Sequence, residues 1–298
     1  MVRRLLLFLL TLASAACSPT GGPAAAPAAS AAAVAPDASL FAYDASAPLD
    51  LVERGSAADG SLTVRDVDFA SPKGGRARAY LITAQSTGRV PAMVFVAGSN
   101  QRREDIRAEA IAVARRGVVA LILEQSQVAA GRSPIWTFTL QDRAEAVQTV
   151  IDARRSIDLL AARADVDAAR IGYYGFSYGA WLGAITTVVD RRIGLLVLRS
   201  GGPQILAEIA RASSRTTTPQ YEVLMTAVDQ MAYAANVTTP VLVQNGSRDT
   251  TYTPEQMRAW QSIVGGVKTA TMYDAGHTLD ATANADALAW IAERWRLP

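Results

Sequence analysis

The sequence predicts an α/β domain in which a mostly parallel sheet of eight strands carries helices on both faces. Continuous apolar runs such as Ala92–Ala97 and Val118–Leu123 are typical of strands buried on both faces. Helix-like segments alternate with these runs, which indicates parallel strands joined by crossover helices. Of the 298 residues, 50% are hydrophobic and 19% charged, so the chain can bury a sizeable core.

The first two strands, Leu62–Phe69 and Arg78–Thr83, alternate in polarity, and we expect them to form an antiparallel pair. Short apolar segments bounded by turn residues predict the other strands of the sheet. These six are Ala92–Ala97, Val118–Leu123, Arg170–Tyr174, Leu195–Leu198, Val241–Asn245 and Thr269–Tyr273.

Helices are expected between these strands. Arg102–Arg116 has helical character and ends at Gly117, a typical helix stop. Gln141–Arg163 repeats apolar residues with the helical period, which predicts a long amphipathic helix. A further helix is expected to run to Val189, and Asp280–Trp295 is expected to close the domain.

The segment 203–236 interrupts the alternation of strands and helices. It contains two helix-like pieces, Gln204–Ala212 and Tyr221–Ala235, around a polar stretch. An insertion after a late strand, above the strand ends, predicts a lid or pocket wall. The alternative is a surface excursion with no role in binding.

The first 17 residues are typical of an export signal. Arg3 and Arg4 precede the apolar run Leu5–Leu12, and small residues follow up to Cys17. The segment resembles a bacterial lipoprotein signal, in which the cysteine becomes acylated. The alternative is ordinary cleavage within Ala13–Ala16. We therefore expect an exported protein, either a lipoprotein of the cell envelope or a periplasmic or extracellular protein.

Residues 18–45 are predicted to be a disordered tether between this signal and a domain at 46–298. Up to Ser39 they are almost entirely Ala, Pro, Gly, Ser and Thr, which offer little to bury in a core. If Cys17 is lipidated, such a tether holds the domain away from the membrane. The alternative is a simple linker left after processing.

Composition excludes several kinds of function. The formal charge is +2 with no cluster of basic residues, so nucleic acid is not an expected partner. Cys17 is the only cysteine and His277 the only histidine. The domain therefore has no disulfide, no thiol nucleophile and no site built from several cysteines or histidines. No metal or cofactor is expected.

The segment Arg170–Ala184 carries the strongest functional motif, G-F-S-Y-G, with Ser177 at its centre. A strand is predicted before the motif and an Ala-rich helix after it, which is the setting of a nucleophile elbow. The serine then occupies a strained turn at a helix N-terminus, where developing negative charge is favoured. Its neighbours two before and two after must be tiny, as Gly175 and Gly179 are. Ser177 is the predicted nucleophile.

A serine hydroxyl needs a base to accept its proton, and His277 is the only imidazole in the chain. The base in turn needs a carboxylate that orients it and stabilises its charged form. Asp249, in the loop after strand Val241–Asn245, is the predicted acid. Asp229 and Asp274 are alternatives, the first within the insertion and the second close to His277 in sequence.

Two backbone N–H groups are needed for the oxyanion that forms during acyl transfer. One is expected from Tyr178, directly after the nucleophile. The other is expected from the loop after strand Ala92–Ala97, with Ser99 as first choice and Asn100 as second.

The span from Leu62 to Trp295 resembles the α/β-hydrolase superfamily. The residues that carry the resemblance are V-D-A-A-R-I-G-Y-Y-G-F-S-Y-G-A, T-T-P-V-L-V-Q-N-G-S-R-D and D-A-G-H, which are similar to the dienelactone-hydrolase-like and prolyl-oligopeptidase-like branches. The resemblance implies the α/β-hydrolase fold and a triad of Ser177, Asp249 and His277. The usual His-Gly of the oxyanion loop is Ala97-Gly98 here. The nucleophile is serine rather than the cysteine of dienelactone hydrolase proper, so that enzyme's substrate is not carried over.

We therefore expect a serine hydrolase that cleaves carboxylic esters, without a cofactor. A peptidase or amidase with the same three residues, and a catalytically silent binding protein with the same fold, are the alternatives. The expected partner is a small ester or a short peptide. Other strand-end residues are expected to line the pocket. These are Glu124, Gln125, Arg199 and Ser200.

Overall fold

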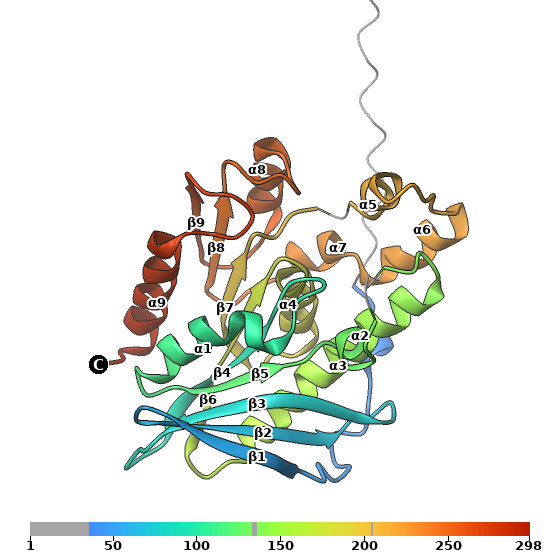
Figure 1. The fold of residues 1–298 in the computed structure, drawn as a ribbon. Coiled ribbons are helices and arrows are strands. Elements are labelled where there is room, and N and C mark those ends of the chain that lie inside the picture. The colour runs from blue at the N-terminus through green and yellow to red at the C-terminus, as the bar shows by residue number, and fades with distance from the viewer. Residues whose placement is uncertain (1–35, 133–135, 204) are drawn as a thin grey trace, which may run out of the picture. The chain divides into compact units, whose positions relative to one another are not determined.

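The computed structural model describes residues 36–132, 136–203 and 205–298. The predicted signal, Cys17 and residues 18–35 of the predicted tether lie outside the described residues. One sheet organises the domain, with strand order β1-β2-β3-β5-β4-β6-β7-β8-β9 (Figure 1). Its strands are β1 (Val52–Asp59), β2 (Leu62–Ala70), β3 (Arg76–Ala84), β4 (Val90–Val96), β5 (Val119–Leu123), β6 (Val166–Phe176), β7 (Ile193–Arg199), β8 (Val241–Gly246) and β9 (Lys268–Tyr273).

The sheet has nine strands, so the prediction of eight was wrong by one. The additional strand is β1, which pairs antiparallel with β2 at the edge of the sheet. Seven of its eight residues are exposed, so it has no alternation of apolar and polar residues. The eight predicted strands are all present.

The strands of the sheet divide into two groups by direction. The strands β1, β2, β3 and β5 are joined by antiparallel pairing. From β5 through β4 to β9 every neighbouring pair is parallel. The carboxyl ends of six parallel strands therefore meet at one edge, where ligands bind in open α/β sheets.

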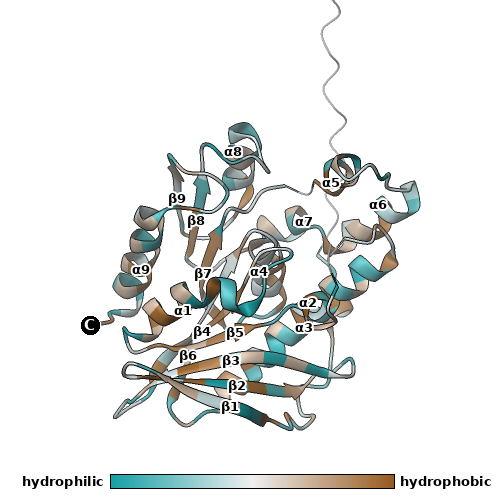
Figure 2. Cartoon of the chain, in the orientation of Figure 1, coloured by the Kyte–Doolittle hydropathy of each residue, from teal (hydrophilic) through white to brown (hydrophobic). Residues whose placement is uncertain are grey.

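Helices cover both faces of this sheet, as predicted. On one face α1 (Arg107–Ala114) and α9 (Ala281–Trp295) pack on the sheet, and on the other face lie α3 (Leu140–Ala161), α4 (Tyr178–Val189) and α8 (Pro254–Ile263). Figure 2 shows hydrophobic residues along the central strands between these layers. The remaining helices are α2 (Ser126–Ala129), α5 (Leu206–Ala212), α6 (Pro219–Met225), α7 (Gln230–Ala234) and the 3-10 helices η1 (Ala38–Phe41), η2 (Arg103–Ile106) and η3 (Thr226–Val228).

The folded domain begins before residue 46, the predicted start. Helix η1 lies in the stretch assigned to the tether, and Phe41 within it is fully buried. The Phe41 ring lies 6.1 Å from the ring of Tyr233, and the Phe41 carbonyl accepts a 2.6 Å hydrogen bond from Arg154. A large aromatic residue thus gives the end of the Ala/Pro-rich stretch the apolar surface that holds it on the domain.

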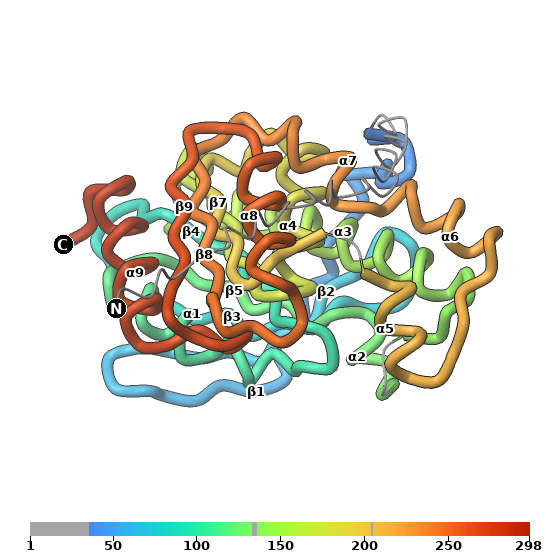
Figure 3. Tube along the Cα trace, turned by 90° about the horizontal axis from the view of Figure 1, so that it is seen from above, coloured from blue at the N-terminus to red at the C-terminus, as the bar shows by residue number. Residues whose placement is uncertain are grey.

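The insertion 203–236 forms α5, α6, η3 and α7, and residue 204 lies outside the described residues. Figure 3 shows α5 and α6 on the side of the domain away from α9. The Tyr221 hydroxyl donates to Asp142 of α3 at 2.9 Å, and the Trp181 indole of α4 donates to the Val228 carbonyl at 2.6 Å. The insertion is therefore fastened to two core helices. Its role as a lid stays a prediction.

The Asp142 carboxylate also holds the loop that precedes α3. It accepts hydrogen bonds from the backbone N–H groups of Thr137 and Phe138, each at 2.8 Å. One buried carboxylate therefore joins this loop to Tyr221 of the insertion.

Within the described ranges, no helix is long and apolar enough to cross a bilayer.

A buried carboxylate on α3 makes stability depend on pH. Asp152 accepts hydrogen bonds from Ser71 (2.6 Å) and Gln148 (3.0 Å), yet burial raises its pKa from 3.8 to about 6. The folded state then binds this proton more tightly than the unfolded chain, so the free energy of unfolding falls as the pH rises from about 4 to about 6. The loss is on the order of 3 kcal/mol.

We expect Asp152→Asn to remove this loss, because its amide oxygen still accepts from Ser71 and Gln148. Thermal unfolding at pH 4 and pH 7 tests it. The Tm of the variant minus the Tm of the unsubstituted protein should be higher at pH 7 than at pH 4, by about 5 °C or more. A difference in Tm that is the same at both pH values would contradict this assignment.

Candidate active site

Ser177 lies at the junction of β6 and α4, as the motif predicts. Its backbone has φ 52° and ψ −112°, a left-handed conformation that a residue with a side chain rarely adopts. The turn is held by the Ser177 N–H, which donates to the Arg199 carbonyl of β7 at 2.8 Å. This strained turn sets the serine at the carboxyl edge of the sheet and at the N-terminus of a 12-residue helix.

The two glycines of the motif are required by close packing around the turn. A Cβ atom on Gly175 would lie 2.2 Å from the Gly179 carbonyl oxygen, and one on Gly179 would lie 2.0 Å from the Val96 carbonyl oxygen. The obstacles are backbone atoms, which cannot move aside as a flexible side chain can. The same contact brings the end of β4 against the start of α4.

The three predicted triad residues lie together in a hydrogen-bonded row. The Oγ of Ser177 is 2.8 Å from Nε2 of His277, and Nδ1 of the same ring is 2.8 Å from Oδ2 of Asp249. His277 lies in the loop after β9 and Asp249 in the loop after β8, so the carboxyl ends of β6, β8 and β9 supply the three groups. The imidazole is 24% exposed and the Asp249 side chain 0%.

The environment of Asp249 favours its ionised form. Burial raises the pKa of this carboxyl, but hydrogen bonds from His277 and from the N–H groups of Thr251 and Tyr252 outweigh burial and hold the pKa below its usual range. An ionised carboxylate can only accept hydrogen bonds. Nδ1 of His277 therefore carries the proton, and Nε2 is left to accept from the serine hydroxyl.

The two alternative acids take other positions. Asp229 caps α7 by accepting from the Met231 N–H at 2.9 Å. Asp274 is 84% exposed and forms an ion pair with Arg248 at 3.1 Å. Among the three aspartates weighed, Asp249 is the one that contacts the imidazole.

Several groups that fix the histidine loop were not predicted. The Ser200 hydroxyl donates to the His277 carbonyl at 2.6 Å, which ties the loop to the end of β7. The rings of Phe176 and Tyr252 lie 5.4 and 6.2 Å from the imidazole and flank it. Ser200 was expected to line the pocket. Its position directly after a strand is the only feature of the sequence that indicates its contact with the His277 loop.

The two predicted oxyanion donors lie on segments that meet at the elbow. Tyr178 is the first residue of α4, so its N–H has no partner within the helix. A Cβ atom on Gly98 would lie 3.1 Å from the Phe176 ring, so the loop that carries Ser99 passes beside the elbow. The Gly98 N–H is already bonded to Oε1 of Gln101 at 2.8 Å. The role of Ser99 as a donor stays a prediction.

Arg199, expected at the pocket, already has partners within the protein. Its guanidinium is 3% exposed, donates to the Tyr174 hydroxyl at 2.6 Å and lies 3.5 Å from Glu109. Arg199 is therefore held in a structural hydrogen bond and ion pair.

Three aromatic side chains pack together at the start of α4. The rings of Trp136, Tyr178 and Trp181 contact one another with centroids 5.0 to 5.6 Å apart, and all three are buried. The three rings form one buried aromatic wall, and two of its members, Tyr178 and Trp181, lie in the first turn of α4, directly after Ser177.

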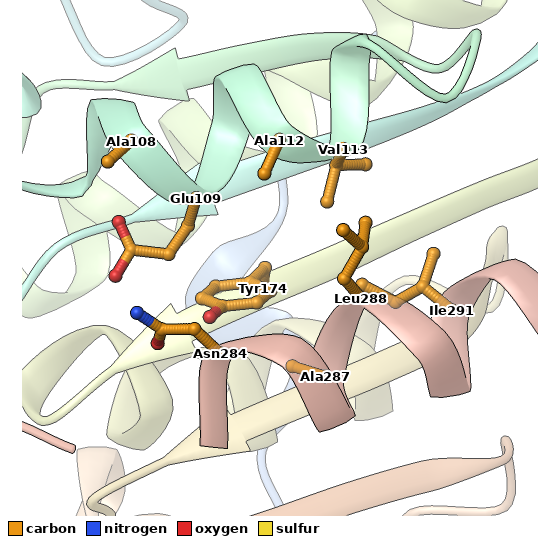
Figure 4. Close-up of a pocket in the computed structure, with 9 residues that line it drawn as sticks. All are labelled: Ala108, Glu109, Ala112, Val113, Tyr174, Asn284, Ala287, Leu288 and Ile291. Atoms are coloured by element: carbon orange, nitrogen blue, oxygen red, sulfur yellow. The ribbon is translucent and has the colours of Figure 1, made fainter. Parts of the chain in front are cut away.

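Two small pockets lie on the α1 and α9 side. One, of about 40 Å³, is lined in part by Phe176 and Thr278, the chain neighbours of Ser177 and His277. The other, of about 100 Å³, lies between α1 and α9 with Glu109 and Asn284 reaching from the two helices beside Tyr174 (Figure 4). Its lining contains none of the three triad residues.

The sheet with its strained serine and adjacent imidazole places the protein among the serine hydrolases of the α/β-hydrolase fold. The chain belongs to the family described as serine hydrolase (FSH1), whose model matches residues 89–285. Uncharacterized proteins from two strains of Mycobacterium tuberculosis are 32% identical to it over 185 residues. The match covers 62% of this chain and spans 62% of the length of those relatives.

Solved structures with a similar fold include two acetyl xylan esterases. An acetyl xylan esterase from Paenibacillus sp. R4 matches with a TM-score of 0.68 at 19% identity, covering 86% of this chain and 91% of that one. Acetyl xylan esterase 1 from Thermoanaerobacterium sp. JW/SL YS485 matches with a TM-score of 0.69 at 17% identity, covering 85% and 90%. At these identities the likeness extends to the fold alone.

Proposed function

We propose that this serine hydrolase cleaves carboxylic esters through an acyl-enzyme, with Ser177 as nucleophile, His277 as base and Asp249 as the acid that orients the base. The observation that carries the proposal is the pair of 2.8 Å contacts that join the three side chains. The ester substrate is supported by the fold, which the acetyl xylan esterases share.

In the first half of the reaction, Ser177 Oγ attacks the ester carbonyl carbon while its proton passes to Nε2 of His277. The carbonyl electron pair moves onto oxygen, and the N–H groups of Tyr178 and Ser99 bind the resulting oxyanion. Asp249 stabilises the imidazolium through its bond to Nδ1. When the carbonyl re-forms, the bond to the alcohol breaks and the alcohol leaves with the proton from Nε2.

In the second half, water attacks the acyl carbon and gives its proton to Nε2. The oxyanion forms again, and its collapse breaks the bond to Ser177 Oγ. The serine recovers its proton from His277 and the carboxylic acid is released. No metal or redox partner is needed, because each step transfers only a proton or an acyl group.

A fluorophosphonate probe and a substrate panel test the proposal. The probe should label the protein at Ser177, and p-nitrophenyl esters should be hydrolysed faster than aminoacyl-p-nitroanilides assayed side by side. Faster cleavage of the anilides would establish the peptidase alternative instead. A folded protein that neither reacts with the probe nor cleaves either substrate would favour the silent binding protein.

A further inference from the structure

We propose that Gln125 is a positioning residue that aims the Ser99 N–H at the oxyanion. The inference rests on the proposed function. Gln125 follows β5 in the chain, and its side chain lies against the loop after β4 that carries Ser99. With 1% of the residue exposed, it was expected to line the pocket but instead lies beneath the loop.

The Gln125 amide group holds two successive carbonyl groups of this loop. Its Nε2 donates to the Ala97 carbonyl and, at 3.1 Å, to the Gly98 carbonyl. Its Oε1 accepts from the Gln127 side chain, which is also buried. Because main-chain carbonyls can only accept, the amide must face the loop with its NH₂ group. Every polar atom of the Gln125 side chain therefore has a partner in one orientation.

The order of the strands indicates the direction in which the N–H groups of these peptides point. β4 lies between β5, which precedes Gln125, and β6, which leads to Ser177. Gln125, from the loop after β5, binds the Gly98 carbonyl oxygen on the side of that peptide that faces the end of β5. In a trans peptide the C=O and N–H bonds point in opposite directions. The N–H of the Gly98–Ser99 peptide, which belongs to Ser99, is therefore turned toward the β6 side, where the nucleophile lies.

The second glutamine of the loop takes up the Gly98 N–H, so the oxyanion donor is a later N–H of the loop, and the direction of its peptide favours that of Ser99. Gln101 accepts the Gly98 N–H through Oε1, and its own N–H donates back to the Gly98 carbonyl at 3.2 Å. The Gly98 N–H is thus used within the loop. Gln125 and Gln101 together fix both peptide planes before substrate arrives, and such preorganisation is what makes an oxyanion hole effective.

The test compares Gln125→Met, which keeps the volume and removes the donor, with the matched control Gln244→Met. Gln244 of β8 is also a fully buried glutamine, and its Nε2 donates to the Tyr273 hydroxyl and the Ala283 carbonyl, not to the oxyanion loop. Steady-state hydrolysis of p-nitrophenyl acetate and inhibition by a trifluoromethyl ketone, which forms a tetrahedral adduct with serine, are measured on the full-length proteins.

We expect Gln125→Met to lower kcat by about tenfold or more with KM changed by less than about twofold, since only the transition state uses the Ser99 donor. Affinity for the ketone should fall by the same factor as kcat/KM. Gln244→Met should keep both values. If Gln125→Met fails to fold, Gln125→Asn retains a buried amide that is too short to reach the loop, and should give the same pattern.

A folded variant of Gln125 with unchanged kcat and ketone affinity would overturn the inference, as would an equal loss in Gln244→Met. Reaction of the unsubstituted protein with the fluorophosphonate probe separates this outcome from failure of the proposed function. A labelled, active protein with a normal Gln125→Met variant refutes the positioning role alone. A protein without labelling or activity refutes the proposed function.

Discussion

Ser177→Ala is expected to lower kcat for ester hydrolysis by about 10³-fold or more, because no other group can form the acyl-enzyme. Reaction with the fluorophosphonate probe should be lost in the same variant. The measurement is a steady-state assay with p-nitrophenyl acetate, together with intact-mass analysis of the probe adduct.

The folded state should survive this change. Removing one hydroxyl from a half-buried position creates no cavity of consequence, although the left-handed backbone at residue 177 is as strained for alanine as for serine. Circular dichroism should therefore show the same Tm within a few degrees. A variant that keeps near-normal turnover would remove Ser177 from the mechanism.

Asp249→Asn is expected to lower kcat by about 10⁴-fold, the loss known for this change in a serine triad. An amide that faces Nδ1 with its NH₂ group would force the proton onto Nε2, the atom that must accept from Ser177. Even in the other orientation the amide carries no charge to stabilise the imidazolium. The loss should appear in kcat measured at neutral pH with a small ester.

Asp274→Asn is the matched control for this prediction. Asp274 lies three residues before His277 in the same loop, but it is exposed and pairs with Arg248 instead of the imidazole. Its replacement should leave kcat within about twofold, since an exposed ion pair contributes little. Equal losses in the two variants would show that charge near the loop, rather than the bond to Nδ1, is what matters.

The places of Ser177, Asp249 and His277 could be predicted because each follows a recognisable strand and the chain has one histidine. Gly175 and Gly179 identify the elbow in the sequence, because backbone atoms lie too close to either residue for it to carry a side chain. Strand β1 was not predictable in the same way. Its residues are exposed, so pairing with β2, and not hydrophobic periodicity, makes it a strand.

Helix α8 was missed although its start carries a local signal. Thr253 caps the helix, Pro254 occupies its first turn and Gln256 completes a capping box. The contact of Gln125 with the oxyanion loop had no such signal. It is a contact between the loops that follow two paired strands, β4 and β5, and no local pattern in the sequence indicates it.

The carboxylate of Asp142 binds both the loop beside the aromatic wall and the insertion. It holds the Thr137–Phe138 backbone, next to Trp136, and at the same time the hydroxyl of Tyr221. Displacing α6 outward would pull on this carboxylate and draw the Trp136 indole away from Tyr178. One carboxylate therefore ties the position of the aromatic wall to that of a helix that begins more than 40 residues after Ser177 in the chain.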